Sequence, residues 1–177
     1  MNMNIAKKIH SKSGFTLIEV IVALVLAGIM AAVAGMGIVY VVKGYIFTQM
    51  NAATLQKGQI AMSRITLELK NISLVSSPST ATSITFYSFK NDLKSKRSIQ
   101  LNVAKIEITE SYTDEAYLPL TDQVEANTGL EFKYYANYDL TTECYPPSAK
   151  VILVTLRLVG ADGSIMELVD RVTPRNI

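Results

Sequence analysis

The sequence predicts an α+β fold in which one long N-terminal helix packs, by its second half, on an antiparallel β-sheet. Three observations lead to this prediction. No charged residue occurs from Val20 to Val42, no proline occurs from Phe15 to Ser77, and the segments after residue 76 are short, rich in β-branched and aromatic residues, and separated by turn signals. The first observation predicts an apolar helix, the second its continuation, and the third the sheet.

The first fourteen residues form a basic leader. They contain Lys7, Lys8, Lys12 and the only histidine of the chain, His10, but no acidic residue. An ordinary secretory signal places its small-residue cleavage site after the apolar stretch, whereas Gly14 precedes it here. Cleavage after Gly14 would leave the apolar stretch on the mature protein. Because basic residues remain in the cytoplasm, we expect the C-terminal part on the periplasmic side of an inner membrane.

Residues 15–42 are predicted to be the membrane-spanning half of the helix. The uncharged run from Val20 to Val42 would extend roughly 35 Å as a helix, enough for a hydrocarbon core of about 30 Å. Residues 43–75 are predicted to be the amphipathic half, with one apolar face. This face consists of Met62, Ile65, Leu69 and Ile72. Gly58 interrupts this half and is expected to weaken it by about 1 kcal/mol relative to alanine.

Residues 76–177 are predicted to form a β-rich globular part. A turn signal at Ser76–Ser79 ends the helix, and residues 113–128 have the composition of a long acidic loop. About six antiparallel strands are expected, because tight turns rather than crossover helices join them. The predicted strands are Ser83–Phe89, Ser98–Val103, Lys105–Tyr112, Gly129–Ala136, Lys150–Val159 and Ser164–Val172.

Charge and composition exclude several function classes. Without the three leader lysines, 14 basic residues face 15 acidic ones, so no nucleic-acid surface is expected. Cys144 is the only cysteine, which rules out an intrachain disulfide and favours a buried thiol. A mature chain without histidine lacks the commonest general base and transition-metal ligand. We therefore expect no catalytic residues, no cofactor and no metal.

Glu19 is the most informative residue of the chain. It lies within the apolar helix, five residues after Gly14, where a carboxylate costs about 2.5–3.5 kcal/mol and requires a partner or a functional reason. The nearest cation would be the α-amino group that cleavage after Gly14 creates on Phe15. A pair between the Phe15 amine of one subunit and Glu19 of another would favour lateral association in lipid, where the hydrophobic effect contributes little.

The segment Gly14–Val20, with its basic leader and apolar helix, resembles the processing site of type IV pilins and of the pseudopilins of type II secretion. The resemblance implies that a membrane prepilin peptidase cleaves between Gly14 and Phe15 and that the same enzyme N-methylates Phe15. It further implies that Glu19 pairs with the Phe15 amine of an adjacent pilin or pseudopilin. An inner-membrane assembly platform would then extract the helix into a filament.

The remainder of the chain resembles this family only in plan. Many major pilins carry a proline in the apolar half and a disulfide-bounded C-terminal loop, which this chain lacks. The stretches Gln59–Ile72 and Val169–Asn176 weakly resemble the J pseudopilin and the W-type minor pilin. We therefore favour a minor, initiating or tip-proximal subunit in a heteromeric filament or tip complex. The alternatives are a major subunit and, in another class, a membrane-anchored periplasmic binding or enzymatic module.

Two weaker patterns have ordinary structural interpretations. Four tyrosines follow one another closely, and we expect them to pack in strands and loops rather than to form a partner surface. They are Tyr134, Tyr135, Tyr138 and Tyr145. Four acidic residues supply the oxygen ligands that calcium prefers, but their spacing fits no defined loop, so a solvated loop is favoured. They are Asp114, Glu115, Asp122 and Glu125.

Overall fold

A computed structural model of the chain describes residues 14–76, 79–90, 93–109 and 116–175. The chain divides into two compact units, residues 1–46 and 47–177, and each is described by itself. One helix, α1, runs over 54 residues from Leu17 to Lys70 and contributes to both units. Antiparallel strands follow it, so the predicted α+β class is confirmed.

The first unit consists of the apolar part of α1. Every side chain from Leu17 to Ile46 is exposed. Among the described residues, α1 is the one helix long and apolar enough to cross a membrane. A helix that is apolar on all sides and uncovered by its own chain requires an apolar environment, either lipid or neighbouring helices.

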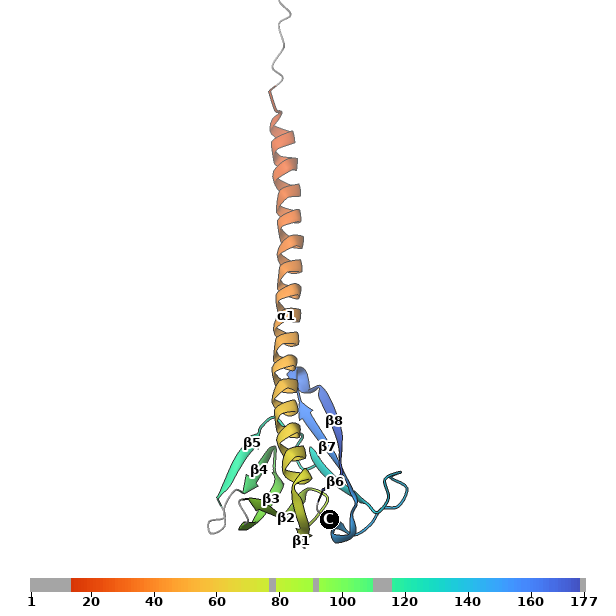
Figure 1. The fold of residues 1–177 in the computed structure, drawn as a ribbon. Helices are drawn as coiled ribbons and strands as arrows, with labels where there is room; N and C mark the ends of the chain where they lie inside the picture. Colours follow the sequence, from red (N-terminus) through yellow and green to blue (C-terminus); the bar gives the residue numbers. More distant parts are fainter. Residues whose placement is uncertain (1–13, 77–78, 91–92, 110–115, 176–177) are drawn as a thin grey trace, which may run out of the picture. The chain divides into compact units, whose positions relative to one another are not determined.

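In the second unit, α1 lies against two β-sheets, with β2–β5 to its left and β6–β8 to its right (Figure 1). The helix buries one face, which includes Met62, Ile65 and Leu69 as predicted, together with Thr54 and Ala61. The opposite face, which includes Ile60 and Leu67, is exposed. This division follows the 3.6-residue period of the sequence, because side chains three and four residues apart lie on the same side of a helix.

Gly58 has a packing role that the sequence did not reveal. It is buried, and a β-carbon at this position would lie 2.1 Å from Leu158 Cδ1 and 3.0 Å from Leu168 Cδ1. These leucines belong to strands β7 (Val151–Val159) and β8 (Ile165–Val172). The glycine lowers intrinsic helix stability, but its missing side chain allows the helix to approach the sheet closely.

The helix ends at Lys70, five residues before the predicted boundary. Asn71 closes the last turn, since its backbone N–H and its side-chain amide donate to the carbonyls of Glu68 and Leu67. The next residues form strand β1 (Ile72–Ser76). Ile72, which was predicted on the helical face, is buried in this strand instead. Over so short a stretch, the apolar residues after Asn71 fit both the 3.6-residue period of a helix and the two-residue period of a strand. Pairing with the neighbouring strand β2 selects the strand.

The first sheet contains five antiparallel strands in chain order, β1 to β5. Three of its strands were predicted, although β3 begins five residues earlier than expected. A fourth, β5, lies in the region predicted to be a loop and contains Pro119, which suits a strand at the edge of a sheet. Besides β1, the bounds are β2 Ser83–Lys90, β3 Leu93–Asn102, β4 Lys105–Thr109 and β5 Tyr117–Thr121.

The second sheet contains three antiparallel strands in the order β6–β7–β8, with β6 at Leu130–Tyr135. All three were predicted within one or two residues. The β-structure thus forms two sheets rather than the single sheet expected from the sequence. The strongly apolar β7 is central and fully paired, as a strand buried on both sides should be. Short 3₁₀ helices occur at Pro146–Ser148 and Ala161–Gly163.

An ion-pair network connects α1 to the first sheet. Arg64 and Glu68 lie one turn apart on α1 and form an ion pair at 2.9 Å, and Glu68 also accepts a hydrogen bond from Arg97 of β3 at 2.5 Å. Arg97 is only 7% exposed, and its Nε has no partner among the described residues. A buried charge of this kind is stable only while its partner remains in place, so this pair fixes the register of helix and sheet.

Candidate functional site

The Gly14–Phe15 peptide lies outside the helix. Gly14, Phe15 and Thr16 have no regular secondary structure, and α1 begins at Leu17. Phe15 is 81% exposed. A peptide bond within a helix is shielded by the surrounding turn and engaged in its hydrogen bonds, whereas the two residues that form this bond are exposed and lie outside the helix. The predicted cleavage position therefore lies in an exposed segment without regular secondary structure.

Thr16 determines where the helix begins. Its side-chain oxygen accepts a hydrogen bond from the Glu19 backbone N–H at 3.3 Å, and its carbonyl accepts from the Val20 N–H, also at 3.3 Å. This is the N-cap arrangement, and Thr16 with Glu19 has the S/T-x-x-E spacing of a capping box. This role was not predicted, although the spacing is readable from the sequence alone.

Glu19 lies in the first turn of α1 and is exposed. A carboxylate is favourable at this end of a helix, because the unpaired N–H groups there carry partial positive charge. Beside it runs a groove of about 540 Å³ that is otherwise apolar. It is lined by Phe15, Glu19, Val20, Ala23, Leu24 and Ala27. The small side chains of Ala23 and Ala27 leave room for another helix to approach Glu19 closely.

The structure thus brings the three predicted site residues together at the start of α1. Gly14 and Phe15 form an accessible peptide, and Phe15 and Glu19 line the same groove. The basic leader residues Lys7, Lys8, His10 and Lys12 lie outside the described residues. Among the described side chains, Glu19 forms no ion pair.

Of the acidic residues considered for calcium, Asp122 and Glu125 lie in the described part of the chain. Asp114 and Glu115 lie outside the described residues, and the described part of the chain contains no group of three or more His, Cys, Asp or Glu side chains that could hold a metal. Asp122 pairs instead with Lys57 of α1, at 2.9 Å. The hydrogen bond from the Lys57 ammonium group lowers the pKa of the Asp122 carboxyl from its ordinary value of 3.8.

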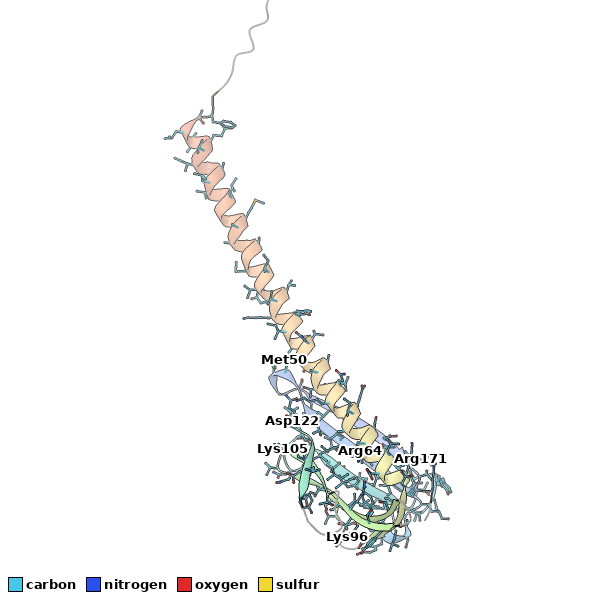
Figure 2. All side chains as sticks on the ribbon, turned by 60° about the vertical axis from the view of Figure 1, so that its left-hand side comes forward. Met50, Arg64, Lys96, Lys105, Asp122 and Arg171 are labelled. Carbon is cyan, nitrogen blue, oxygen red and sulfur yellow. The ribbon has the colours of Figure 1, made fainter. Side chains whose placement is uncertain are left out.

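A shallow groove of about 430 Å³ adjoins this ion pair. Lys57, Lys105 and Asp122 contribute its charges, and Ile60 and Leu120 contribute apolar surface. Figure 2 shows Lys105 and Asp122 close together in the second unit. The ion pair of Lys57 with Asp122 connects the segment after β5 to α1, so these two residues have a structural role.

The tyrosines do not form a single surface. Tyr134 faces the core and is 8% exposed, and burial raises the pKa of its hydroxyl. Tyr138 and Tyr145 are both largely exposed. The cysteine, Cys144, is partly buried against the core, and burial raises the pKa of its thiol. A thiol in this environment is less reactive than an exposed one.

Comparison with known proteins supports the interpretation of the N-terminus. The family model described as the prokaryotic N-terminal methylation motif matches residues 9–35, which include Gly14, Phe15 and Glu19. The chain carries a type IV pilin-like prepilin N-terminus. This pilin-like motif indicates a structural subunit of a filament rather than an enzyme.

This family model matches no residues after residue 35. No curated protein matches the sequence. The motif and the apolar first part of α1 are consistent with anchoring in a membrane, assembly with other pilins and processing by a prepilin peptidase.

Proposed function

We propose that the protein is a minor pilin or pseudopilin, a structural subunit that initiates or lies near the tip of a type IV pilus or type II secretion pseudopilus. The observation that carries the proposal is the methylation motif at residues 9–35, in which an accessible Gly14–Phe15 peptide precedes a helix carrying an exposed Glu19. The membrane half of α1 has no covering of its own, as a subunit that packs against others requires.

In this proposal, prepilin peptidase cleaves after Gly14 and N-methylates Phe15. The mature subunit is anchored in the inner membrane by residues 15–42, with the part after residue 76 in the periplasm. The new Phe15 amine, or that of a neighbouring subunit, then meets the Glu19 carboxylate. In lipid an isolated ammonium group and an isolated carboxylate are each unfavourable, and pairing neutralises one with the other. The pairing therefore drives lateral association of the subunits before the assembly platform extracts the helix.

The preference for a minor subunit rests on two features of the sequence. The stretches Gln59–Ile72 and Val169–Asn176 resemble J-type pseudopilins and W-type minor pilins, and Cys144 alone provides no disulfide-bounded loop. Counting the copies of this chain per filament tests the preference. A few copies per filament support a minor role, and one copy for each helical rise of the filament would make the chain the major subunit.

Substitution of Glu19 tests the proposed function. The variants are Glu19→Gln, which keeps the shape and removes the charge, and Glu19→Val; Val20→Leu in the next position is the matched control. We expect both Glu19 variants to insert and to be cleaved, but to enter sheared filaments at least about tenfold less than the control, because pairing of a buried charge is lost. Normal incorporation of Glu19→Val would instead favour an anchored binding or enzymatic module, since a tether needs no buried carboxylate.

A further inference from the structure

The two sheets of the second unit end in four edge strands, and three of these edges are protected. Strands β1 and β5 are each five residues long, and the pairing of each with its neighbour contains a shift of register. Strand β5 also contains Pro119, which has no N–H group. The outer edge of β6 is bonded to other segments, because Phe132 donates to the Ala81 carbonyl and the Tyr134 carbonyl accepts from Cys144. Short, irregular or covered edges resist pairing with another chain.

Strand β8 has none of these features. Its eight residues pair with β7 one by one, from Ile165 to Val172, without a shift of register, and they include no proline, glycine or lysine. The strand is the last of its sheet, as Figure 1 shows. A long and regular edge strand of this kind presents a row of backbone donors and acceptors, to which a strand of another chain can add.

The hydrogen bonds of β7 determine which backbone groups of β8 face its open side. Arg157 of β7 donates to the Gly129 carbonyl at 2.8 Å and accepts from the Glu125 N–H at 2.9 Å, so both of its groups point away from β8. In an antiparallel ladder this direction alternates along the strand. The neighbours of Arg157 on β7 therefore bond to β8, where their partners are Leu168 and Met166.

The residues beside these partners, Glu167 and Val169, therefore direct their N–H and C=O groups to the open side. Among the described residues, no other backbone group bonds to them. Arg171 follows the same alternation, because its N–H is free to donate to the Asp170 carboxylate, at 2.8 Å. The open groups recur at every second residue, about 7 Å apart. An extended chain repeats at this distance, whereas the backbone groups of a helix bond to one another, so the edge selects an extended segment.

The side chains on the outer face of β8 indicate which residues suit an added strand. Ile165 and Val169 are 56% and 54% exposed, although both are large and apolar, and Glu167 and Arg171 are exposed as well. Side chains directly opposite one another in an antiparallel pair lie about 5 Å apart, and pairs of opposite charge or of two apolar residues are stabilising. A complementary strand therefore places a basic residue opposite Glu167, an apolar residue opposite Val169 and an acidic residue opposite Arg171.

Both charged groups retain the capacity for a further partner. Glu167 accepts a hydrogen bond from Arg157 at 2.8 Å, but a carboxylate has about four acceptor positions and the Glu167 side chain is 49% exposed. Arg171 donates to the Tyr138 carbonyl, but a guanidinium group has several N–H donors. On the other face of β8, Leu168 is only half-buried, so an apolar residue of an added strand would cover it.

We infer that the open edge of β8 binds an extended segment of a second protein, as a fourth strand antiparallel to β8. Antiparallel pairing is the more stable kind, and both sheets use it throughout. Along its own chain, the segment carries an acidic, an apolar and a basic residue at alternate positions, opposite Arg171, Val169 and Glu167 in turn. The inference goes beyond the proposed function, because it assigns a binding surface to a part of the chain that the methylation motif does not include.

A second copy of β8 has the same order of residues but the wrong direction. Strand β8 runs along α1, because Ala161, shortly before it, bonds to Asn51 at 2.8 Å, and Asp170, near its end, bonds to Thr66 at 2.9 Å. Two copies joined by antiparallel β8 strands would therefore have these parts of α1 pointing in opposite directions. In the proposed function, copies anchored in one membrane enter the periplasm in the same direction, so the segment belongs to a different protein.

Binding of defined peptides to the full chain, purified in detergent, tests the inference. The probe is the fluorescent peptide Thr-Glu-Lys-Val-Leu-Lys-Val-Thr-Thr, in which the glutamate faces Arg171, the first valine faces Val169 and the second lysine faces Glu167. The matched control exchanges this glutamate with that lysine and has the same composition. We expect the probe to bind about tenfold more tightly than the control, measured by fluorescence anisotropy, because two attractive pairs replace two repulsive ones. Equal affinities, or tighter binding of the control, would overturn the inference.

A proline at position 169 tests the edge itself. The Val169 N–H faces the open side, so Val169→Pro removes one donor from the edge without breaking a bond to β7. Val169→Thr is the matched control, since it keeps the N–H group and the β-branched shape. We expect Val169→Pro, with an unchanged urea transition, to bind the probe at least about tenfold more weakly than the wild type, and Val169→Thr to bind it within about twofold. Unchanged affinity of a folded Val169→Pro variant would show that the probe does not bind as a strand at this edge.

A charge reversal provides a second variant, which leaves the backbone of the edge intact. Glu167→Arg combined with Arg171→Glu should reverse the preference, so that the control peptide binds about tenfold more tightly than the probe. A reversed variant that still preferred the probe would contradict the pairing proposed for these two residues.

Photo-crosslinking in cells identifies the natural segment. The photoreactive residue p-benzoylphenylalanine replaces Ile165 in the full chain in its own membranes, and mass spectrometry of the adduct identifies the peptide that is reached. We expect a segment of another protein with acidic, apolar and basic residues at alternate positions. The adduct yield should fall at least about tenfold with Val169→Pro and remain with Val169→Thr. An adduct with lipid or with a second copy of this chain, or a yield that Val169→Pro leaves unchanged, would overturn the inference.

The two proposals fail differently. Equal affinities for the two peptides would overturn the binding edge and leave the proposed function standing, because residues 9–35 lie outside β8. A mature chain that does not begin at Phe15 would overturn the proposed function, while the peptide measurements would still decide whether the edge of β8 binds a strand.

Discussion

The two units of this molecule obtain their stability from different sources. Residues 47–177 enclose a core of their own, in which Ile65, Phe86 and Leu156 are completely buried. In residues 17–46, by contrast, every side chain is exposed. The second unit therefore contains the contacts needed to fold by itself, whereas the first is helical with no tertiary contact to its side chains. In the proposed function its partners are lipid and other subunits, so its substitutions should affect assembly rather than unfolding.

Removal of residues 1–46 should have the largest effect and tests this comparison directly. The fragment 47–177 keeps the whole core, so we expect it to unfold in one cooperative transition, because small single domains normally do so. It should lose all association with membranes. Urea unfolding followed by circular dichroism and flotation with lipid vesicles measure the two properties. A fragment without a cooperative transition would show that the second unit depends on the first.

The next largest effect is expected from Glu68→Ala. This change leaves Arg97, which is only 7% exposed, without its carboxylate, and a buried uncompensated charge costs about 3–5 kcal/mol. The free energy of unfolding of fragment 47–177 should fall by this amount, while cleavage after Gly14 in the full chain remains unchanged. The double variant Glu68→Met with Arg97→Met removes both charges and should recover most of the loss. If Glu68→Ala unfolded like the wild type, the ion pair would have no structural role.

A pair of glycine substitutions sharpens the comparison between the units. At Gly58 an alanine β-carbon would lie 2.1 Å from Leu158 Cδ1, so Gly58→Ala forces the core apart and should destabilise the second unit by about 1–3 kcal/mol. At Gly37 nothing lies within 4 Å of the added carbon. Gly37→Ala in the full chain should therefore leave the urea transition unchanged. Equal effects at the two positions would contradict the assignment of Gly58 to the packed face.

The smallest effect is expected at the exposed pair of Lys57 and Asp122. The lysine lowers the pKa of Asp122 below 3.8, so the pair stabilises the fold above that pH. This contribution is lost as the pH falls through the lowered pKa, because the carboxyl then becomes protonated in the folded state as well. Both side chains are about half exposed, and Asp122→Asn should cost less than about 1 kcal/mol at neutral pH.

Urea titrations of fragment 47–177 and its Asp122→Asn variant, at neutral pH and near pH 3, measure the contribution of this pair to the free energy of unfolding. The difference between the two proteins should shrink at the lower pH and at high salt, since the charge interaction is weakened under both conditions. A difference that grew as the pH fell would mean that Asp122 stabilises the fold in its protonated form.

The sequence was sufficient to predict the elements whose pattern is local. The apolar run from Val20 to Val42, the Met62–Ile65–Leu69 face and the β7–β8 hairpin each have a period that one short window reveals, and all three are present. The juxtaposition of Gly14, Phe15 and Glu19 was predictable for the same reason, because these residues lie within six positions of one another.

Features that depend on distant residues were missed. Strand β1 follows directly from the helix and pairs with β2, and β5 contains a proline and pairs with β4 only at a sheet edge. Neither has a local pattern that distinguishes it from helix or loop. The contacts of Glu68 with Arg97 and of Gly58 with Leu158 join residues far apart in the sequence. Only the folded arrangement brings them together. The Thr16 cap was readable from its spacing and was overlooked.

The most direct test of the central claim is the intact mass of the protein purified from the membranes of cells that carry the assembly machinery. The account predicts a chain that begins at Phe15 and is heavier than the unmodified residues 15–177 by one methyl group, with the modification on the α-amine. A chain that begins at Met1, or after a small residue downstream of Gly14, would contradict it.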